Sequence, residues 1–548
     1  RVNAPSLRIE TVAAGGGSIC WFDGTALRVG PSSAGASPGP ACYGAGGPLT
    51  ITDVNLLLGR LDAVRFGIPV FPEEADKSFR ELIDGIEAQS DSPISEREVL
   101  LGLLDIANER MADAIRGISL RQGYAPSEYA LVAFGGAGGM HACSIADILK
   151  MDTILFPSDA GLLSAYGLQQ ARMEGFGERQ VLRLLSECLS ALPGLIGELE
   201  SEAVASLVDQ GESEDGLVRQ SAQVEMRFIG QEASLLIDLS FVASLEDAFL
   251  SAFEVQYGFV PEQAIEVVSV KVSVVTRAGD LGSESFKSDK RYQVGEDVFC
   301  DRDALQSGHV LEGPAVIQDR FSTIFVEMGW TVVVGSQSSL KLERSSVGAQ
   351  EKRTSLEAVQ LELFTNRFLS LVEEMGSLLE RSAFSTNVKE RKDFSCALLD
   401  RDGYLLANAP HIPVHLGALG VCVRQASEAL EMGPCDVVVT NHPGFGGSHL
   451  PDVTLIAPIY SDEGARVGFV ANRAHHAEIG GIAPGSMPPD AKSLLEEGVV
   501  IAPMYLVRKG VAQWARIEHL FKAVPFPTRR MEENLSDLAA QLASIRFG

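Results

Sequence analysis

The segment that says most about the fold is residues 449–478, HLPDVTLIAPIYSDEGARVGFVANRAHHAE. Two apolar runs, Val453 to Tyr460 and Arg466 to Asn472, are separated by the polar segment Ser461 to Ala465. Two strand-like runs joined by a short polar turn predict an antiparallel hairpin, in which facing residue numbers sum to about 926. The hairpin places the segment within a sheet.

Residues of the types that bind metals lie at the open end of this hairpin. Residue 452 would face residue 474, so His449 and Asp452 would lie beside His475 and His476. Two imidazoles and one carboxylate with open coordination positions suit a divalent transition metal such as Zn, Mn or Fe. We therefore predict a metal or catalytic site here, and a hydrogen-bonded histidine pair is the alternative.

Other polar residues could assist such a site. A metal-bound water needs a carboxylate to take its proton, and Glu478 and Asp393 are the candidates. His411 and His415 are four residues apart, but the prolines in this segment exclude a regular helix across them, so they are not the helical ligand pair of a metalloprotease. A ligand or substrate contact and a packing role both stay open for them. Six of the nine histidines fall in this region: His411, His415, His442, His449, His475 and His476.

Two glycine-rich loops in the first third of the chain could bind phosphate. The first separates strand-like residues 8–14 and 19–22, which predicts a hairpin with a glycine tip. The second lies between a predicted strand at 129–134 and a helix at 140–150, the layout of an α/β phosphate site. Neither loop matches a dinucleotide or P-loop motif, but together they could hold a nucleotide from two sides, while tight turns are the alternative. The loop residues are Gly15, Gly16, Gly17, Ser18, Gly135, Gly136, Gly138 and Gly139.

Composition and patterning suggest a multidomain protein of α/β and α+β class. Its net charge of −28 argues against a nucleic-acid partner. No apolar run reaches the roughly 18–20 residues that span a bilayer, so we expect a cytoplasmic protein without a membrane partner. The eight cysteines form no C-x-x-C pair, which gives no sign of a zinc knuckle. The predicted parts are an α/β domain at 1–175, a mainly β domain at 176–343, a polar linker at 344–356 and an α+β domain at 357–548.

Several long motifs resemble the hydantoinase A and hydantoinase B families. The motifs similar to the second half of hydantoinase A are Ala13–Ile19, Val29–Gly35 with Pro38–Gly44, Thr52–Asn55 with Leu58–Leu61, and Phe134–Ala142. Those similar to the opening of hydantoinase B are residues 386–417, Asn441–Asp452, Arg473–Gly481 and Gly485–Pro489. Their order in one chain is typical of the fused, oxoprolinase type.

The resemblance implies an ATP-dependent hydrolase of cyclic amides, acting on 5-oxo-L-proline, a hydantoin or another lactam. The A-type part would have an actin- and sugar-kinase-like ATPase fold and bind ATP with Mg²⁺ through both glycine loops. ATP would phosphorylate the lactam oxygen so that metal-activated water can open the ring. By resemblance His449, Asp452 and His475 are the metal ligands, Asp393 is the catalytic carboxylate, and His476 could replace His475. Assembly into a homo-oligomer is also implied.

Two departures from the family pattern bear on activity. The family's Asp-x-Gly-Gly-Thr phosphate loop is absent and the B-type part is short, so we expect that this chain alone does not complete ATP-driven hydrolysis. It could then be a truncated product that retains metal binding. A ketone carboxylase-like enzyme and a metal-dependent hydrolase without ATP also stay open. Arg473, Lys389 and Arg391 are candidate cations for an anionic substrate.

Overall fold

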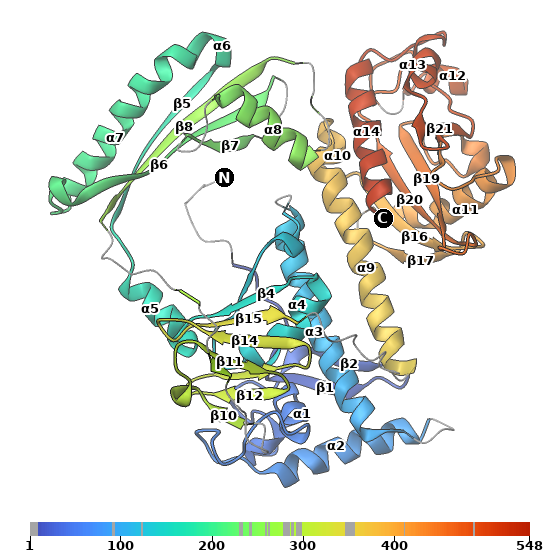
Figure 1. Ribbon diagram of the computed structural model, residues 1–548. Coiled ribbons are helices and arrows are strands. Elements are labelled where there is room, and N and C mark those ends of the chain that lie inside the picture. The colour runs from blue at the N-terminus through green and yellow to red at the C-terminus, as the bar shows by residue number, and fades with distance from the viewer. Residues whose placement is uncertain are drawn as a thin grey trace. The chain divides into compact units, whose positions relative to one another are not determined.

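The computed structural model mixes helices and sheets (Figure 1). The chain divides into two compact units. Unit 1 consists of Arg1–Ala171 with Asp280–Arg367, and unit 2 of Arg172–Gly279 with Phe368–Gly548. None of the described helices is long and apolar enough to cross a bilayer. The described residues are 9–89, 94–121, 124–229, 234–239, 244–257, 260, 263–277, 285–286, 290–291, 299–345, 357–409, 412–485 and 488–548. Most of the predicted linker, from 346 to 356, therefore lies outside the described residues, as does His411.

Unit 1 contains a six-stranded mixed sheet in the order β3-β4-β15-β14-β11-β9, a three-stranded sheet β10-β12-β13 and the hairpin β1-β2. The six-stranded sheet joins distant parts of the chain, because β4 pairs antiparallel with β15. The strands are β1 (Ser18–Phe22), β2 (Leu27–Ser33), β3 (Leu131–Val132), β4 (Thr153–Phe156), β9 (Lys290–Arg291), β10 (Phe299–Asp301), β11 (His309–Glu312), β12 (Ala315–Gln318), β13 (Thr323–Val326), β14 (Trp330–Val334) and β15 (Leu340–Arg344).

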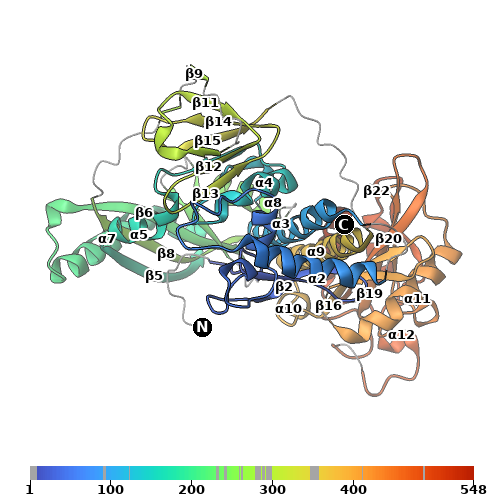
Figure 2. The same ribbon diagram turned by 90° about the horizontal axis from the view of Figure 1, so that it is seen from below.

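Helices complete this unit. They are α1 (Ile51–Leu57), α2 (Pro72–Glu87), α3 (Glu96–Arg121), α4 (Ala142–Leu149), α5 (Leu163–Gln169) and the first part of α9 (Glu357–Ser382). The start of α9 lies alongside α3 in both views (Figures 1 and 2). Its Glu362, 1% exposed, receives ion pairs from Arg28 and Arg110, and its Arg367 pairs with the buried Glu109 of α3 at 2.9 Å. These pairs hold the first part of α9 within unit 1.

The structure corrects the predicted glycine-tipped hairpin. Residues 9–14 form no strand, and the hairpin is instead β1 with β2. Its turn is closed by Asp23, whose Oδ1 accepts hydrogen bonds from the backbone N–H groups of Thr25 and Ala26 at 2.8 and 2.7 Å. An aspartate that accepts from the residues two and three positions ahead favours a tight turn at that point. Gly15 to Gly17 consequently precede β1, and Ser18 is its first residue.

In unit 2, residues 368–548 form a seven-stranded sheet in the order β17-β16-β20-β19-β18-β21-β22. Alternate strand residues pack on opposite faces, as the strand period of two requires. Val470 and Ala474 join the core beneath α9 and α14, whereas Phe469 and Ala471 join the core beneath α11. The strands are β16 (Phe394–Asp400), β17 (Leu405–Asn408), β18 (Val437–Thr440), β19 (Asp452–Tyr460), β20 (Arg466–His475), β21 (Met504–Arg508) and β22 (Val511–Ala512).

Unit 2 contains the seven-stranded sheet and a four-stranded sheet, and its remaining helices belong to the segments that form these two sheets. Around the seven-stranded sheet lie α10 (Thr386–Lys389), α11 (Pro413–Ala429), α12 (Leu494–Glu497), α13 (Trp514–Lys522) and α14 (Met531–Phe547). Residues 172–279 form the four-stranded sheet β5-β8-β6-β7. Its elements are β5 (Glu174–Leu184), α6 (Leu185–Cys188), α7 (Leu192–Asp209), β6 (Leu217–Phe228), β7 (Leu235–Asp238), α8 (Leu245–Tyr257) and β8 (Ile265–Thr276). The two units divide the chain differently from the predicted domains, whose bounds stay predictions.

Candidate active site

The hairpin of β19 and β20 is present, with a register one residue away from the predicted one. Asp452 faces His475 and Val453 faces Ala474, so that facing numbers sum to 927 over most of the ladder. The register shifts between Ile459 and Tyr460, next to the turn. A shift of one residue changes which side chains share a face. The observed register places Asp452 and His475 directly opposite each other.

A cluster of three metal-binding side chains lies at this end of the hairpin. The ligand atoms of His449, Asp452 and His475 all lie within 4.8 Å of one another. His475 Nδ1 lies 2.6 Å from Asp452 Oδ1, and His449 Nδ1 lies 3.2 Å from Asp452 Oδ2. Asp452 is 1% exposed, while the side chain of His449 is 42% exposed. The cluster therefore has a buried carboxylate and one side open to solvent.

A fourth side chain, His415, reaches the same carboxylate. Its Nε2 lies 3.7 Å from Asp452 Oδ1, and its Nδ1 lies 3.1 Å from the Ser395 hydroxyl. His415 is buried in the first turn of α11, which begins at Pro413. The sequence pattern alone did not indicate this contact with Asp452, because it joins a helix to a hairpin.

Mutual contacts shift the pKa values of this cluster. Burial opposes ionisation of Asp452, but hydrogen bonds from His415 and His475 and the positive charges of those rings outweigh it and lower the pKa of the carboxyl group. Burial also disfavours the charged form of His475, yet the hydrogen bond to Asp452 and the charges of Asp452 and Asp393 raise its pKa overall. A carboxylate that stays ionised is the form in which it binds metal.

Arg473 holds the loop that carries His449. The guanidinium group is fully buried, and it donates to Thr454 Oγ1 at 2.8 Å, to Ser448 Oγ at 3.0 Å and to the Gly446 carbonyl at 2.9 Å. Its donors thus join β19 and β20 to the segment just before His449. The structure gives this candidate substrate cation a role in fixing the loop.

Two other residues predicted to be catalytic, His476 and Glu478, use their side chains in hydrogen bonds to other parts of the chain. His476 follows His475 but points to the opposite face, where its ring nitrogens lie 2.7 Å from Asn534 Oδ1 and 3.1 Å from Gln541 Oε1 of α14. The Glu478 carboxylate accepts hydrogen bonds from the Gly480 N–H at 2.9 Å and from the Thr528 hydroxyl at 2.6 Å. It also accepts from the main-chain N–H of Arg529 at 2.9 Å and from its guanidinium group at 2.7 Å. The structure does not bring these two side chains into the metal-binding cluster, and both have structural partners.

Asp393 is placed differently. Its carbonyl accepts the backbone N–H of His475 at 2.9 Å, which fixes it beside the cluster. Its carboxylate is partly exposed and has no hydrogen bond or ion pair within the described part of the chain. It is therefore the predicted carboxylate that is left available for proton transfer.

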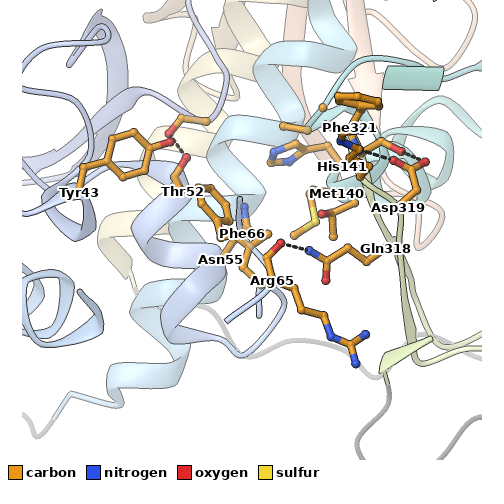
Figure 3. A pocket seen from close by; sticks show the side chains of 17 residues that line it. Tyr43, Thr52, Asn55, Arg65, Phe66, Met140, His141, Gln318, Asp319 and Phe321 are labelled. Atoms are coloured by element: carbon orange, nitrogen blue, oxygen red, sulfur yellow. Dashed lines mark hydrogen bonds between the residues drawn. The ribbon is translucent and has the colours of Figure 1, made fainter. Parts of the chain in front are cut away.

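The two glycine loops meet in unit 1. Gly16 and Gly136 both line one cavity of about 300 Å³. Figure 3 shows this cavity with other residues of its wall, among them Thr52 and His141. Thr52 donates its backbone N–H to the Gly16 carbonyl at 2.9 Å, and Thr323 donates to the Gly136 carbonyl at 3.1 Å. Neither glycine N–H donates a hydrogen bond within the described residues, so both amides are available to an anion. The other predicted loop residues flank these two without lining the cavity.

Asp53 of α1 has a structural role in this part of the chain. It is fully buried, and its carboxylate accepts from the backbone N–H groups of Ala41, Cys42 and Thr50 and from the Thr50 hydroxyl, at 3.1, 2.7, 2.7 and 2.8 Å. Thr50 and Asp53 form the capping box of α1.

The fold is that of a mixed α/β protein. It has a candidate metal centre at His449, Asp452 and His475 and a glycine-lined cavity in unit 1. Family models described as Hydantoinase/oxoprolinase and Hydantoinase B/oxoprolinase match residues 1–175 and 357–548 respectively, and the chain belongs to this hydantoinase/oxoprolinase family.

Similar proteins extend over the whole chain. It is 36% identical to a 5-oxoprolinase of Saccharomyces cerevisiae and 37% identical to 5-oxoprolinase 1 of Arabidopsis thaliana, covering 100% of this chain and 46% and 47% of those proteins. The chain thus spans about half the length of the curated relatives it matches. The crystal structure of an ATP-dependent caprolactamase from Pseudomonas jessenii aligns with a TM-score of 0.54 and 27% identity over 63% of this chain and 54% of that chain.

Proposed function

We propose that this protein takes part in ATP-dependent hydrolysis of a cyclic amide, 5-oxo-L-proline or a related hydantoin or lactam. The observation that carries the proposal is the His449–Asp452–His475 cluster, which lies in the region matched by the hydantoinase B model. Support comes from similarity along the entire chain to 5-oxoprolinases and from the structural similarity to an ATP-dependent caprolactamase. These relatives favour amide hydrolysis over ketone carboxylation.

The cluster fits a divalent transition metal, with His449, Asp452 and His475 as ligands. Two imidazoles and a buried carboxylate form a donor set that Zn, Mn and Fe accept, and the exposed His449 side leaves coordination positions free. When bound, such a metal supplies water activation and polarisation of an amide oxygen. Nothing in the donor set selects among the three metals.

The residues around the cluster have distinct roles in this proposal. Asp393 accepts the proton of the attacking water, because its main chain is bonded to His475, its charge acts on that ring, and its carboxylate has no hydrogen bond or ion pair among the described residues. His415 orients Asp452 from the side of α11. Arg473 fixes the loop that carries His449. His476 and Glu478 keep the surrounding chain in place through α14 and Arg529.

The A-type part would supply the ATP chemistry. An unactivated amide is a poor electrophile, and phosphorylation of its oxygen creates a leaving group that lowers the barrier to attack by water. We assign nucleotide binding, with Mg²⁺, to the cavity between Gly16 and Gly136, on an actin- and sugar-kinase-like fold. The two available glycine N–H groups support this assignment.

Elemental analysis of the purified chain tests the metal centre first. We expect about one transition-metal ion per chain in the wild type and loss of the metal in His449→Ala and His475→Ala. His476→Ala is the matched control, since this neighbouring histidine faces α14 and should leave metal content unchanged. ATP-dependent ring opening is then assayed with the same variants. A metal-free wild type that also rejects added Zn, Mn and Fe would refute the proposal.

A further inference from the structure

The cavity in unit 1 has three buried hydrogen-bond acceptors that find no partner among the residues that the structure describes. They are Asn55 Oδ1, His141 Nε2 and Gln318 Oε1, and all three residues line the cavity (Figure 3). Their residues are 3%, 4% and 9% exposed. A buried acceptor that loses water without gaining a donor costs about 1–3 kcal/mol. Three such atoms around one cavity indicate a ligand that donates hydrogen bonds.

The protein fixes these atoms as acceptors by using the donors of the same side chains elsewhere. Asn55 Nδ2 donates to the Ile51 carbonyl at 3.1 Å within α1, and Gln318 Nε2 donates to the Arg65 carbonyl at 3.1 Å. Both amide groups are therefore oriented with oxygen, not nitrogen, left over.

His141 completes the set from the turn before α4. Its Nδ1 lies 2.7 Å from Asn108 Oδ1, which is an acceptor, so Nδ1 carries the proton. Burial, with a smaller contribution from the positive charge of Arg60, lowers the pKa of His141 to about 4. The ring is then neutral at pH 7, and Nε2 offers a lone pair to the cavity.

Other groups on the cavity wall differ in chemistry from these three. Gly16 and Gly136 offer backbone N–H groups, and Arg65 and Arg320 offer positive charge, all of which suit phosphate. Tyr43 and Phe66 supply aromatic rings whose centroids are 6.1 Å apart. Donors for an anion, aromatic surface and neutral acceptors in one cavity match the phosphates, base and donor groups of a nucleotide.

We propose that Asn55, His141 and Gln318 form an acceptor subsite for the nucleoside part of a nucleotide, binding its O–H or N–H donors. This inference rests on the proposed nucleotide site and adds its selectivity. The donors are ribose hydroxyls or an exocyclic amine of the base, because both present the same chemistry to neutral acceptors.

Modified nucleotides test the subsite without altering the protein. We would measure affinities for ATP, 2′-deoxy-ATP, 3′-deoxy-ATP and the triphosphate of purine riboside, which lacks the amine, by titration calorimetry with Mg²⁺. At least one analogue should bind about tenfold to a hundredfold more weakly than ATP, since its acceptor is left unpaired. A loss with the deoxy nucleotides identifies ribose as the source, and a loss with purine riboside identifies the amine.

Protein variants then show whether these acceptors cause the selectivity. Gln318→Met and Asn55→Leu each remove one acceptor, and the penalty for the matching analogue should shrink at least threefold in one of them, as a double-mutant cycle requires when the two groups interact. Gln425→Met is the matched control, because Gln425 also has a buried unpartnered Oε1 but lies in α11 of unit 2. It should leave every affinity unchanged.

Two results would overturn this inference in different ways. If ATP binds but all analogues bind equally well, or if penalties are the same in wild type and variants, the acceptor subsite is wrong while the nucleotide site survives. If ATP itself shows no saturable binding, the nucleotide half of the proposed function fails together with the subsite.

Discussion

The candidate metal centre of unit 2, formed by His449, Asp452 and His475, and the cavity of unit 1 are built in different ways. The cluster depends on charge: a carboxylate that is 1% exposed is surrounded by the three imidazoles of His415, His449 and His475. The facing strands β19 and β20 set the spacing of Asp452 and His475. The cavity combines neutral acceptors and backbone groups from loops, α1 and the end of β12 with the charged side chains of Arg65 and Arg320. Charge concentrated in one buried residue makes the first site sensitive to a single substitution, whereas the second distributes its interactions.

The largest effect should therefore follow from Asp452→Ala. Removing one member of a buried charged network leaves its partners without a counter-charge. This lowers the free energy of unfolding by about 3–5 kcal/mol. We expect that loss in urea unfolding, together with complete loss of bound metal by elemental analysis. Asp452→Asn keeps the volume of the side chain but removes its charge, so comparing it with Asp452→Ala separates the effect of packing from that of charge. If the alanine variant keeps its metal and unfolds within about 1 kcal/mol of the wild type, the cluster does not depend on this charge.

The same comparison explains what could be predicted from sequence. Asp452 and His475 were within reach of sequence reasoning because strand periodicity and a short turn define which residues pair. The one-residue offset was not, since it arises from the irregularity at Ile459 and Tyr460 beside the turn. His415 contacts Asp452 only through the packing of α11, which no local pattern reports.

The cavity was less predictable. Gly16 and Gly136 were candidates because glycine-rich loops next to strands are a visible pattern. Asn55 and Gln318 look like ordinary polar residues in a helix and a strand, and only tertiary structure shows that their donors are occupied and their acceptors are free. The predicted glycine-tipped hairpin does not form, because β1 pairs with β2 across the turn that Asp23 closes and not with residues 9–14.

A second, smaller effect should come from Arg473→Met. The variant removes three hydrogen bonds from a buried guanidinium group and should cost about 2–3 kcal/mol. Because those bonds fix the loop before His449, metal affinity should also fall by about tenfold. Metal competition with a chelator measures the second effect. Lys522→Met is the control: it breaks an exposed pair with Glu518 at 3.0 Å, worth under about 0.5 kcal/mol. Equal effects of the two substitutions would contradict the role of Arg473.

Substitutions of two glycines in the second loop, Gly139 and Gly136, test the cavity of unit 1. A Cβ on Gly139 would lie 2.7 Å from the Thr323 carbonyl and 2.7 Å from the Ile324 side chain, so Gly139→Ala should cost about 1–2 kcal/mol. A Cβ on Gly136 would meet only the Phe321 carbonyl, at 3.4 Å, and leave stability nearly unchanged. Gly136→Ala should instead weaken ATP binding about tenfold, since the added methyl group lies beside the cavity wall. Thermal unfolding and nucleotide titration measure the two effects, and a stable Gly136→Ala variant with wild-type ATP affinity would argue against the loop as a nucleotide contact.

The smallest effect concerns Glu478, the predicted catalytic residue whose bonds are structural. Burial opposes its ionisation, but hydrogen bonds from Thr528 and from the main chain and guanidinium of Arg529 lower the pKa of the carboxyl group overall. A carboxyl group whose pKa is lower in the folded state stabilises the fold above its unfolded pKa of about 4.3, and this contribution is lost as the pH falls through the folded value. Glu478→Gln should therefore cost about 1 kcal/mol at pH 7 and progressively less below about pH 4, as measured by urea unfolding at both pH values. Glu463→Gln, in the exposed turn between β19 and β20, should cost little at either pH. If Glu478→Gln instead abolished ring opening without changing stability at pH 7, Glu478 would belong with Asp393 in the chemistry, and the division between structural and catalytic carboxylates drawn from their hydrogen bonds would be wrong.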